Sequence, residues 1–285
     1  MISVGHWVRR RRVARRPENP YVAGTPVFDE TLFYGRESAT RWALGRLASG
    51  NVRVTGERRI GKTSFLHHLR RVLAAQTGER RAFPVFVDLE CVTEAGLLRA
   101  LLEETVDAVA APETLHAALR PETADGQYDN ADFTRALGWV LDELRSRSGQ
   151  PPLLVYLIDE VDALFDRPGA DEQSLAALSG RWPDEVRVVL AGVSRNGTGR
   201  GEHRWLDAFD EMELPPLTEE AAAALVRQPV AGVIRYEAAA VARILEWSRR
   251  RPYLIQKLCV RLMDRVLEEG RRVVRKADVD AEARP

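Results

Sequence analysis

The chain has 285 residues, 45% of them hydrophobic, and its 42 basic and 42 acidic side chains give a formal net charge of zero at pH 7. This composition favours a globular protein with one large domain, or one domain and a smaller lobe. No apolar run approaches the length of a membrane span and no signal peptide is visible, so we expect a cytoplasmic protein without a membrane span.

An arginine-rich tail opens the chain. Six of the first sixteen residues are arginine: Arg9, Arg10, Arg11, Arg12, Arg15 and Arg16. Such a tail can bind nucleic acid, anionic lipid or an acidic partner, or it can be a disordered, solvated extension. Because no aromatic residues alternate with the arginines, we favour disorder over residues 1–18 and keep nucleic acid as the less favoured partner.

Strand and helix patterns alternate from about residue 37 onward, which predicts an α/β fold with a parallel sheet covered by helices. We expect strands over residues 52–55, 83–89, 153–158, 186–191 and 209–214. We expect helices over residues 37–47, 62–75, 94–110, 131–147 and 172–178, and loops over 121–130 and 196–201. The strands are continuous apolar runs, which is typical of strands buried on both faces. Residues 19–214 therefore form the expected core domain.

The strand pattern stops after Leu214, and a small helical domain is expected over residues 215–270. Thr218 is an N-cap candidate, because two glutamates follow it in the first turn of a helix that would end at Arg227. Further helices are expected over residues 237–249 and 252–268, and residues 271–285 resemble the truncated start of another unit, of winged-helix type. The two cysteines, Cys91 and Cys259, lie far apart, and we expect both thiols to be buried rather than joined or bound to a metal.

A phosphate-binding motif follows the first predicted strand. It reads G-x-x-x-x-G-K-[ST] and consists of Gly56, Glu57, Arg58, Arg59, Ile60, Gly61, Lys62 and Thr63. The two glycines let successive N–H groups point at phosphate oxygens, Lys62 adds a positive charge, and the Thr63 hydroxyl can bind Mg²⁺. Ser64 continues into a helix whose positive N-terminus points at the same phosphates. The motif predicts a bound nucleoside triphosphate.

A pair of carboxylates ends the third predicted strand. Asp159 and Glu160 close the apolar run over residues 153–158, at the edge of the sheet where ligands bind in open α/β folds. We expect Asp159 to hold Mg²⁺ opposite Thr63, and Glu160 to orient and deprotonate the attacking water. The alternative is that the pair merely ends a strand and begins a helix capped by Asp162.

The strand over residues 186–191 is expected beside the strand that precedes the phosphate-binding loop. Its polar end, Ser194 and Arg195, would then face the γ-phosphate, and either side chain could detect that phosphate. Two interpretations of Arg195 stay open: it is either a catalytic group or a surface residue of a loop.

With these motifs the chain resembles the additional-strand class of P-loop ATPases, in which one strand separates the P-loop strand from the Asp-Glu strand. More narrowly, it resembles the STAND-type relatives of AAA+ proteins, the signal-transduction ATPases with numerous domains. Three further stretches carry this resemblance: residues 19–22 with 33–37 (Phe-Tyr-Gly-Arg-Glu), residues 214–221 (Leu-Pro-Pro-Leu-Thr-Glu-Glu-Ala), and residues 248–256 (Ser-Arg-Arg-Arg-Pro-Tyr-Leu-Ile-Gln). The first stretch would lie along adenine through Tyr34, Gly35 and Arg36, and Pro252 of the third would touch the base. Residues alone do not decide between adenine and guanine.

The chain departs from the family pattern in two ways. Where the lid motif usually has glycine, it has Arg249 and Arg250, and these or Arg251 would be either a phosphate sensor or a solvated basic patch. The resemblance also implies an effector domain before the ATPase and a winged helix with repeats after it, both lacking here, so we expect an effector encoded separately. Arg200 and Arg204 are candidates for an arginine that acts on a neighbouring subunit of a nucleotide-dependent oligomer.

Three functions follow from these expectations. The leading one is a slowly hydrolysing, Mg²⁺-dependent ATP switch that moves its lid. The second is a DNA-associated initiator or loader that uses the arginine-rich arm and lid. The third is a non-hydrolysing scaffold with structural nucleotide.

Overall fold

A computed structural model of the chain describes residues 17–76, 80–92, 96–110, 129–165, 174–175, 178, 180–192 and 204–283. Its strands in the core are β1 (Asn51–Thr55), β2 (Ala82–Asp88), β3 (Leu153–Asp159), β4 (Val186–Ala191) and β5 (Phe209–Glu213). Its core helices are η1 (Glu30–Leu32), α1 (Glu37–Leu47), α2 (Lys62–Ala75), α3 (Leu97–Ala108), α5 (Asn130–Ser148), α6 (Asp162–Phe165) and η3 (Arg204–Ala208). The predicted α/β class is confirmed.

The five strands form one parallel sheet in the order β2-β3-β4-β1-β5. β4 pairs with β1 through Val54 and Ala191, and with β3 through Ile158 and Leu190. The predicted additional strand between the P-loop strand and the Asp-Glu strand is therefore confirmed. Because all strands are parallel, their carboxyl ends meet at one edge of the sheet.

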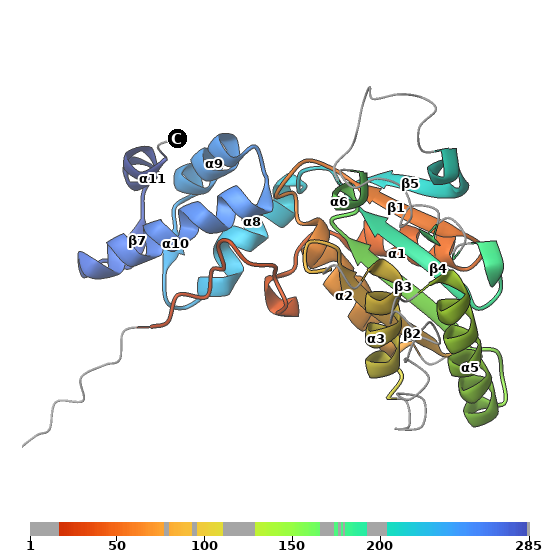
Figure 1. Cartoon of the computed structure of the whole chain (residues 1–285). Helices are drawn as coiled ribbons and strands as arrows, with labels where there is room; N and C mark the ends of the chain where they lie inside the picture. Colours follow the sequence, from red (N-terminus) through yellow and green to blue (C-terminus); the bar gives the residue numbers. More distant parts are fainter. Residues whose placement is uncertain are drawn as a thin grey trace, which may run out of the picture.

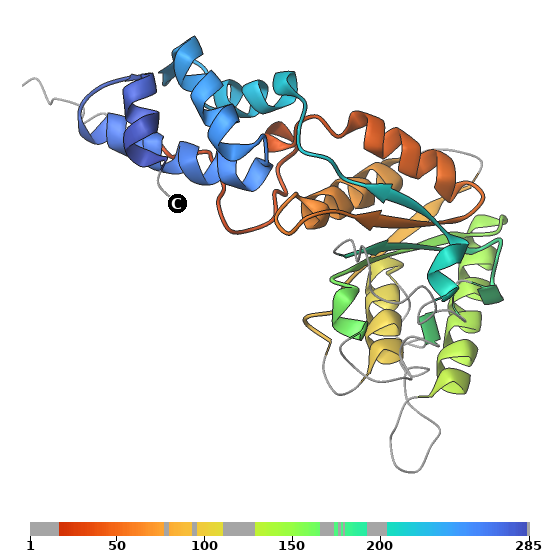
Figure 2. The ribbon, with the colours of Figure 1, turned by 90° about the horizontal axis from the view of Figure 1, so that it is seen from above.

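Both faces of the sheet are covered, because alternate residues of each strand point to opposite sides. Leu154, Tyr156 and Ile158 of β3 pack in the cluster that includes α3 and α5. Val155 and Leu157 pack with α1 and α2 on the other face. Figure 2 shows the two helix pairs on opposite sides of the sheet, which gives a three-layer core.

A helical lobe follows β5 and lies beyond one end of the core (Figure 1). It comprises α8 (Glu219–Arg227), η4 (Gln228–Val230), β6 (Arg235–Tyr236), α9 (Ala238–Ser248), α10 (Pro252–Glu268), β7 (Val273–Val274) and α11 (Lys276–Glu282). The predicted cap is present, since the Thr218 hydroxyl accepts the Ala221 N–H at 3.2 Å. The lobe has its own apolar core, which also takes in the buried ring of Tyr21.

The segment after residue 270 packs into this lobe. β7 pairs with β6, and Val274 and Val279 are buried in the core of the lobe. The expected boundary at residue 270 therefore falls inside a continuous packing unit.

The expectation for Cys91 was wrong, whereas the expectation for Cys259 is confirmed: Cys91 is exposed and Cys259 is buried. The reason is that β2 ends at Asp88, so Cys91 lies in the turn that follows, with its N–H donating to the Asp88 carbonyl at 3.1 Å. The helix expected over residues 172–178 and the loop over 121–130 lie largely outside the described residues, and the loop over 196–201 lies wholly outside them. Within the described part, no helix combines the length and apolarity needed to cross a bilayer.

Candidate functional site

The phosphate-binding loop leaves the carboxyl end of β1 and enters α2 at Lys62. Gly56 and Gly61 have φ angles of 150° and 99°, and Arg59 between them has a φ of 64°. A Cβ added to Gly56 would lie 3.0 Å from Ile60 Cγ2 and 3.2 Å from the Leu214 carbonyl oxygen, so the site requires glycine. The loop therefore curls back on itself as the motif predicts.

Lys62 is only 7% exposed, and its Nζ donates to the carbonyl oxygens of Gly56 at 3.1 Å and Glu57 at 3.3 Å. Burial lowers the pKa of Lys62, and the carboxylates of Glu160 and Asp159 oppose this shift. The ammonium is thus held inside the loop, where phosphate oxygens can replace the two carbonyls as its acceptors.

Asp159 ends β3 and is 1% exposed. Its carboxylate is hydrogen-bonded to the Thr63 hydroxyl and accepts the Glu160 N–H at 3.0 Å. Burial raises the pKa of Asp159, while these two hydrogen bonds lower it in part. Asp159 and Thr63, which we predicted as metal ligands, therefore meet across the sheet edge.

Glu160 follows immediately and adopts a left-handed backbone with a φ of 51°. A residue other than glycine is held in this region only where the surrounding structure imposes it. Burial raises the pKa of Glu160, and the nearby charges of Asp159 and Glu90 raise it further. This is the direction that suits a general base working near neutral pH.

Two acidic residues near this pair escaped the sequence analysis. Asp88 ends β2 and is in register with Asp159 of β3, and Glu90 follows in the next turn. Asp88 raises the pKa of Asp159, as Glu90 does that of Glu160. The rule that identified Asp159, a carboxylate at the end of an apolar strand, would also have identified Asp88.

The helical lobe contacts the phosphate-binding loop directly. Arg251 Nη2 lies 2.5 Å from Glu57 Oε2, and the Arg59 guanidinium lies over the Tyr253 ring, 4.5 Å from its centroid. Pro252, the predicted base contact, lies between Arg251 and Tyr253 and is the first residue of α10. The start of α10 and the variable positions of the loop therefore form one contact, which we call the lobe latch.

Arg249 and Arg250, which stand where the lid motif of the resembled family usually has glycine, both adopt a backbone conformation that glycine adopts easily. Their φ angles are 49° and 58°, both left-handed. The Arg250 carbonyl accepts the Leu217 N–H at 3.0 Å, which joins this turn to the linker before α8.

The segment before α1 runs between lobe and core. Val27 N–H donates to the Ser64 hydroxyl at 2.9 Å, and Tyr34 packs against the lobe. Gly35 has a φ of 68°, and a Cβ on it would lie 2.3 Å from the Ala221 Cβ. Arg36 is buried, and its side chain donates to main-chain carbonyls of the loop and the linker.

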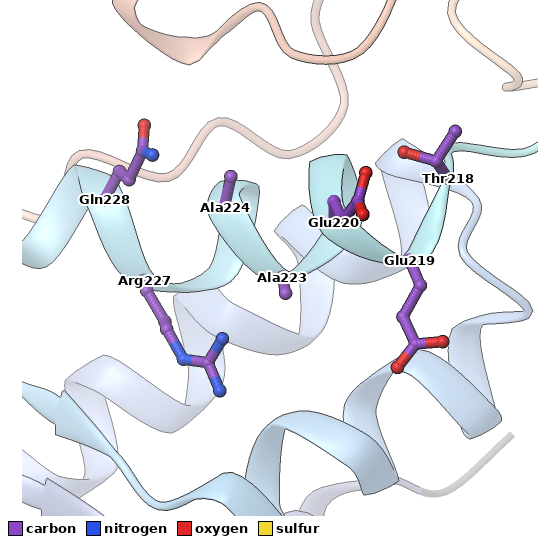
Figure 3. Close-up of a pocket in the computed structure, with 7 residues that line it drawn as sticks. All are labelled: Thr218, Glu219, Glu220, Ala223, Ala224, Arg227 and Gln228. Atoms are coloured by element: carbon purple, nitrogen blue, oxygen red, sulfur yellow. The ribbon is translucent and has the colours of Figure 1, made fainter.

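Several predicted residues are not placed. Ser194, Arg195, Arg200 and the arginines of the first sixteen residues lie outside the described residues. Arg58 is exposed on the loop. A hollow along α8, lined by Thr218, Glu219, Glu220, Ala223, Ala224, Arg227 and Gln228, contains no residue of the phosphate-binding loop and is a different site (Figure 3).

Comparison with known proteins identifies a family and several similar structures. The AAA ATPase domain family matches residues 32–190. The fold is similar to ORC1 of Aeropyrum pernix in complex with DNA, with a TM-score of 0.61 and 18% identity over 88% of this chain and 65% of that one. It is also similar to ORC2 of the same organism in ADPNP–ADP complexes, with a TM-score of 0.62 and 14% identity over 90% of this chain and 70% of that one.

A third similar structure is the RuvB Holliday junction branch migration motor of Thermotoga maritima, with a TM-score of 0.53 and 16% identity over 88% of this chain and 69% of that one. At these identities the likeness shows the fold alone. The chain spans less than two thirds of the length of the ORC1 structure. Comparison with curated protein sequences finds no match.

Proposed function

The chain belongs to the AAA ATPase domain family, and from this premise we propose that it is an ATP-binding, slowly hydrolysing switch of the signal-transduction type. ATP with Mg²⁺ at the phosphate-binding loop would control the position of the helical lobe. The effector would be a separate protein.

The residues of the loop suit a triphosphate. Loop N–H groups and the N-terminus of α2 would bind the phosphates, and Lys62 would exchange its carbonyl acceptors for phosphate oxygens. Tyr34, Gly35, Arg36 and Pro252 would flank or support the base. The preference for adenine rests on the resemblance of these stretches.

The pair of Thr63 and Asp159 fits Mg²⁺, because a hydroxyl and a buried carboxylate already lie within hydrogen-bonding distance. No group of three or more His, Cys, Asp or Glu side chains that could hold a metal ion occurs among the described residues, and Mg²⁺ in nucleotide sites usually takes its other ligands from phosphates and water. When bound there, it would neutralise charge that develops on the phosphates.

Hydrolysis would depend on Glu160. Its raised pKa and its place beside Asp159 support a role in accepting a proton from the attacking water. Arg195 stays a candidate for contacting the γ-phosphate.

The observation that best supports a switch is the lobe latch, the contact between the start of α10 and the phosphate-binding loop. Glu57 and Arg59 are positions that the phosphate-binding motif leaves free, and here both bind the start of α10. Any movement of the loop on binding phosphate therefore acts on the lobe, and movement of the lobe acts on the loop.

An ATPase assay combined with size-exclusion chromatography, with and without ATP, tests this function. We expect Lys62→Ala to lose ATP binding, and Glu160→Gln to bind ATP while its turnover falls on the order of 10²–10⁴-fold. Normal turnover in Glu160→Gln would rule out Glu160 as the general base. Unchanged ATP after long incubation with the wild-type protein would favour a scaffold with structural nucleotide.

A second candidate is a DNA-associated initiator or loader, which the likeness to ORC1 bound to DNA favours. The arginines of residues 1–17 and of the lobe would contact phosphates. DNA binding that falls steeply with salt and is lost on deleting residues 1–17 would support this candidate. Absence of DNA binding at low salt would remove it.

A further inference from the structure

Among the residues that the structure describes, Arg36 is a buried cation without a carboxylate partner. It is 5% exposed, and among the described residues no carboxylate lies within ion-pair distance of its guanidinium. Burial lowers its pKa to about 10, so it stays charged at neutral pH. Two main-chain carbonyls bind it instead: Nη2 donates to Ile60 at 3.1 Å, and Nη1 donates to Pro215 at 2.7 Å.

The hydrogen bond from Arg36 to the Ile60 carbonyl determines which way the peptide group between Ile60 and Gly61 faces. In a planar trans peptide the carbonyl of one residue and the N–H of the next point in opposite directions. Because Arg36 draws the Ile60 carbonyl to its own side, the Gly61 N–H points to the other side. Among the described residues no hydrogen bond is made by the Gly61 N–H, so this donor is free for an anion.

The second bond ties the same guanidinium to the linker between β5 and the lobe. Pro215 precedes Leu217, whose N–H donates to the Arg250 carbonyl at 3.0 Å, and the Gly35–Ala221 contact lies beside it. One rigid fork of donors therefore spans the phosphate-binding loop and the linker.

We propose that Arg36 is a positioning residue that orients the Gly61 N–H toward the phosphates and couples this orientation to the linker of the lobe. The proposal rests on the proposed nucleotide site, but it assigns Arg36 a role other than contact with the base. A loop that moves to accommodate phosphate would pull on Pro215 through Arg36. A displaced linker would turn the Gly61 N–H away from the phosphates.

The test compares Arg36→Met with Arg187→Met. Arg187 is a matched control, because it is 7% exposed and its Nε donates to the Leu47 carbonyl at 3.2 Å, away from the loop. For Arg36→Met we expect an ADP dissociation constant raised on the order of ten-fold, since a phosphate loses a well-oriented donor. Arg187→Met should lower the melting temperature to a similar degree and leave ADP affinity unchanged. Arg36→Lys, which keeps the charge but not the fork, should recover part of the affinity.

Two further measurements separate positioning from general stability. The amide resonance of Gly61 should shift on ADP binding in the wild type and in Arg187→Met, but much less in Arg36→Met. Without nucleotide, hydrogen exchange should rise together at the hydrogen-bonded amides of Ile60, Leu214 and Leu217 in Arg36→Met only. Wild-type ADP affinity and unchanged exchange in Arg36→Met would overturn the proposal. If the wild-type protein binds ATP without hydrolysing it, the proposed hydrolysing switch is wrong. The positioning role of Arg36 would still stand, because it concerns nucleotide binding only.

Discussion

Arg251 at the start of α10 forms an ion pair with Glu57 of the phosphate-binding loop, with 2.5 Å between Nη2 and Oε2. The pair joins the helical lobe to a loop position that lies between the two motif glycines. Arg251 is thus held by a carboxylate of the phosphate-binding loop. ATP would compete with Glu57 for this guanidinium, because both supply anionic oxygens.

The ion pair should contribute little to stability but measurably to holding the start of α10 against the phosphate-binding loop. Both side chains are partly exposed, so a double-mutant cycle with Glu57→Ala and Arg251→Ala should give a coupling energy of about 0.5 kcal/mol in the free energy of unfolding. Hydrogen exchange at the start of α10 should rise in either single variant. The Arg99–Glu103 pair of α3 has similar exposure and serves as the control, with no effect expected on α10. Strictly additive effects and unchanged exchange would contradict the latch.

The rate of hydrolysis should fall in acid at a higher pH than an ordinary glutamate would dictate. The base must be ionised, and burial together with Asp159 raises the pKa of Glu160 above 4.5. Turnover should therefore decline as pH falls through this raised value, while ADP binding, measured in parallel, persists to lower pH. A turnover that stays constant down to pH 4.5 would show that Glu160 does not act as the base.

Asp159→Asn should stabilise the nucleotide-free protein while abolishing Mg²⁺-dependent turnover. Burial raises the folded-state pKa of Asp159 above its ordinary value of 3.8, so the fold favours the protonated carboxyl. Stability from this group is present below the unfolded pKa and is lost as pH rises through the folded pKa. The melting temperature of Asp159→Asn should exceed that of the wild type at pH 7, and the difference should vanish at low pH. A lower melting temperature at pH 7 would mean that the bonds to Thr63 and Glu160 dominate.

Gly35→Ala should destabilise the protein more than Gly24→Ala. Both glycines have positive φ angles, 68° and 99°, so both variants incur backbone strain of about 1 kcal/mol. Only at Gly35 would the new Cβ meet another atom, the Ala221 Cβ at 2.3 Å, which adds about 1–3 kcal/mol of overpacking. Urea unfolding measures both losses. Equal losses in the free energy of unfolding would mean that Ala221 of α8 does not lie close enough to Gly35 to clash with the new Cβ.

Local sequence patterns were enough to predict much of the core. The phosphate-binding loop is a contiguous motif, and its glycine spacing determines the curl that the φ angles of Gly56 and Gly61 show. α2 begins at Lys62 and ends at Ala75 as predicted, because its apolar residues recur at helical spacing. The parallel sheet and the place of β4 beside β1 followed from continuous apolar runs and from the family resemblance.

The contacts that connect lobe and loop are between residues distant in sequence, and only the tertiary structure decided them. Arg36 and Pro215 are 179 positions apart, and no local pattern indicates that a guanidinium will bind that carbonyl. The exposure of Cys91 likewise depends on where β2 ends, which propensity places only within a few residues. The sequence alone was enough to predict that phosphates are bound, because the motif for that chemistry resides in eight consecutive residues. Which elements contact the phosphate-binding loop depended on the packing of the lobe against the loop, since long-range side-chain contacts form only once the chain is folded.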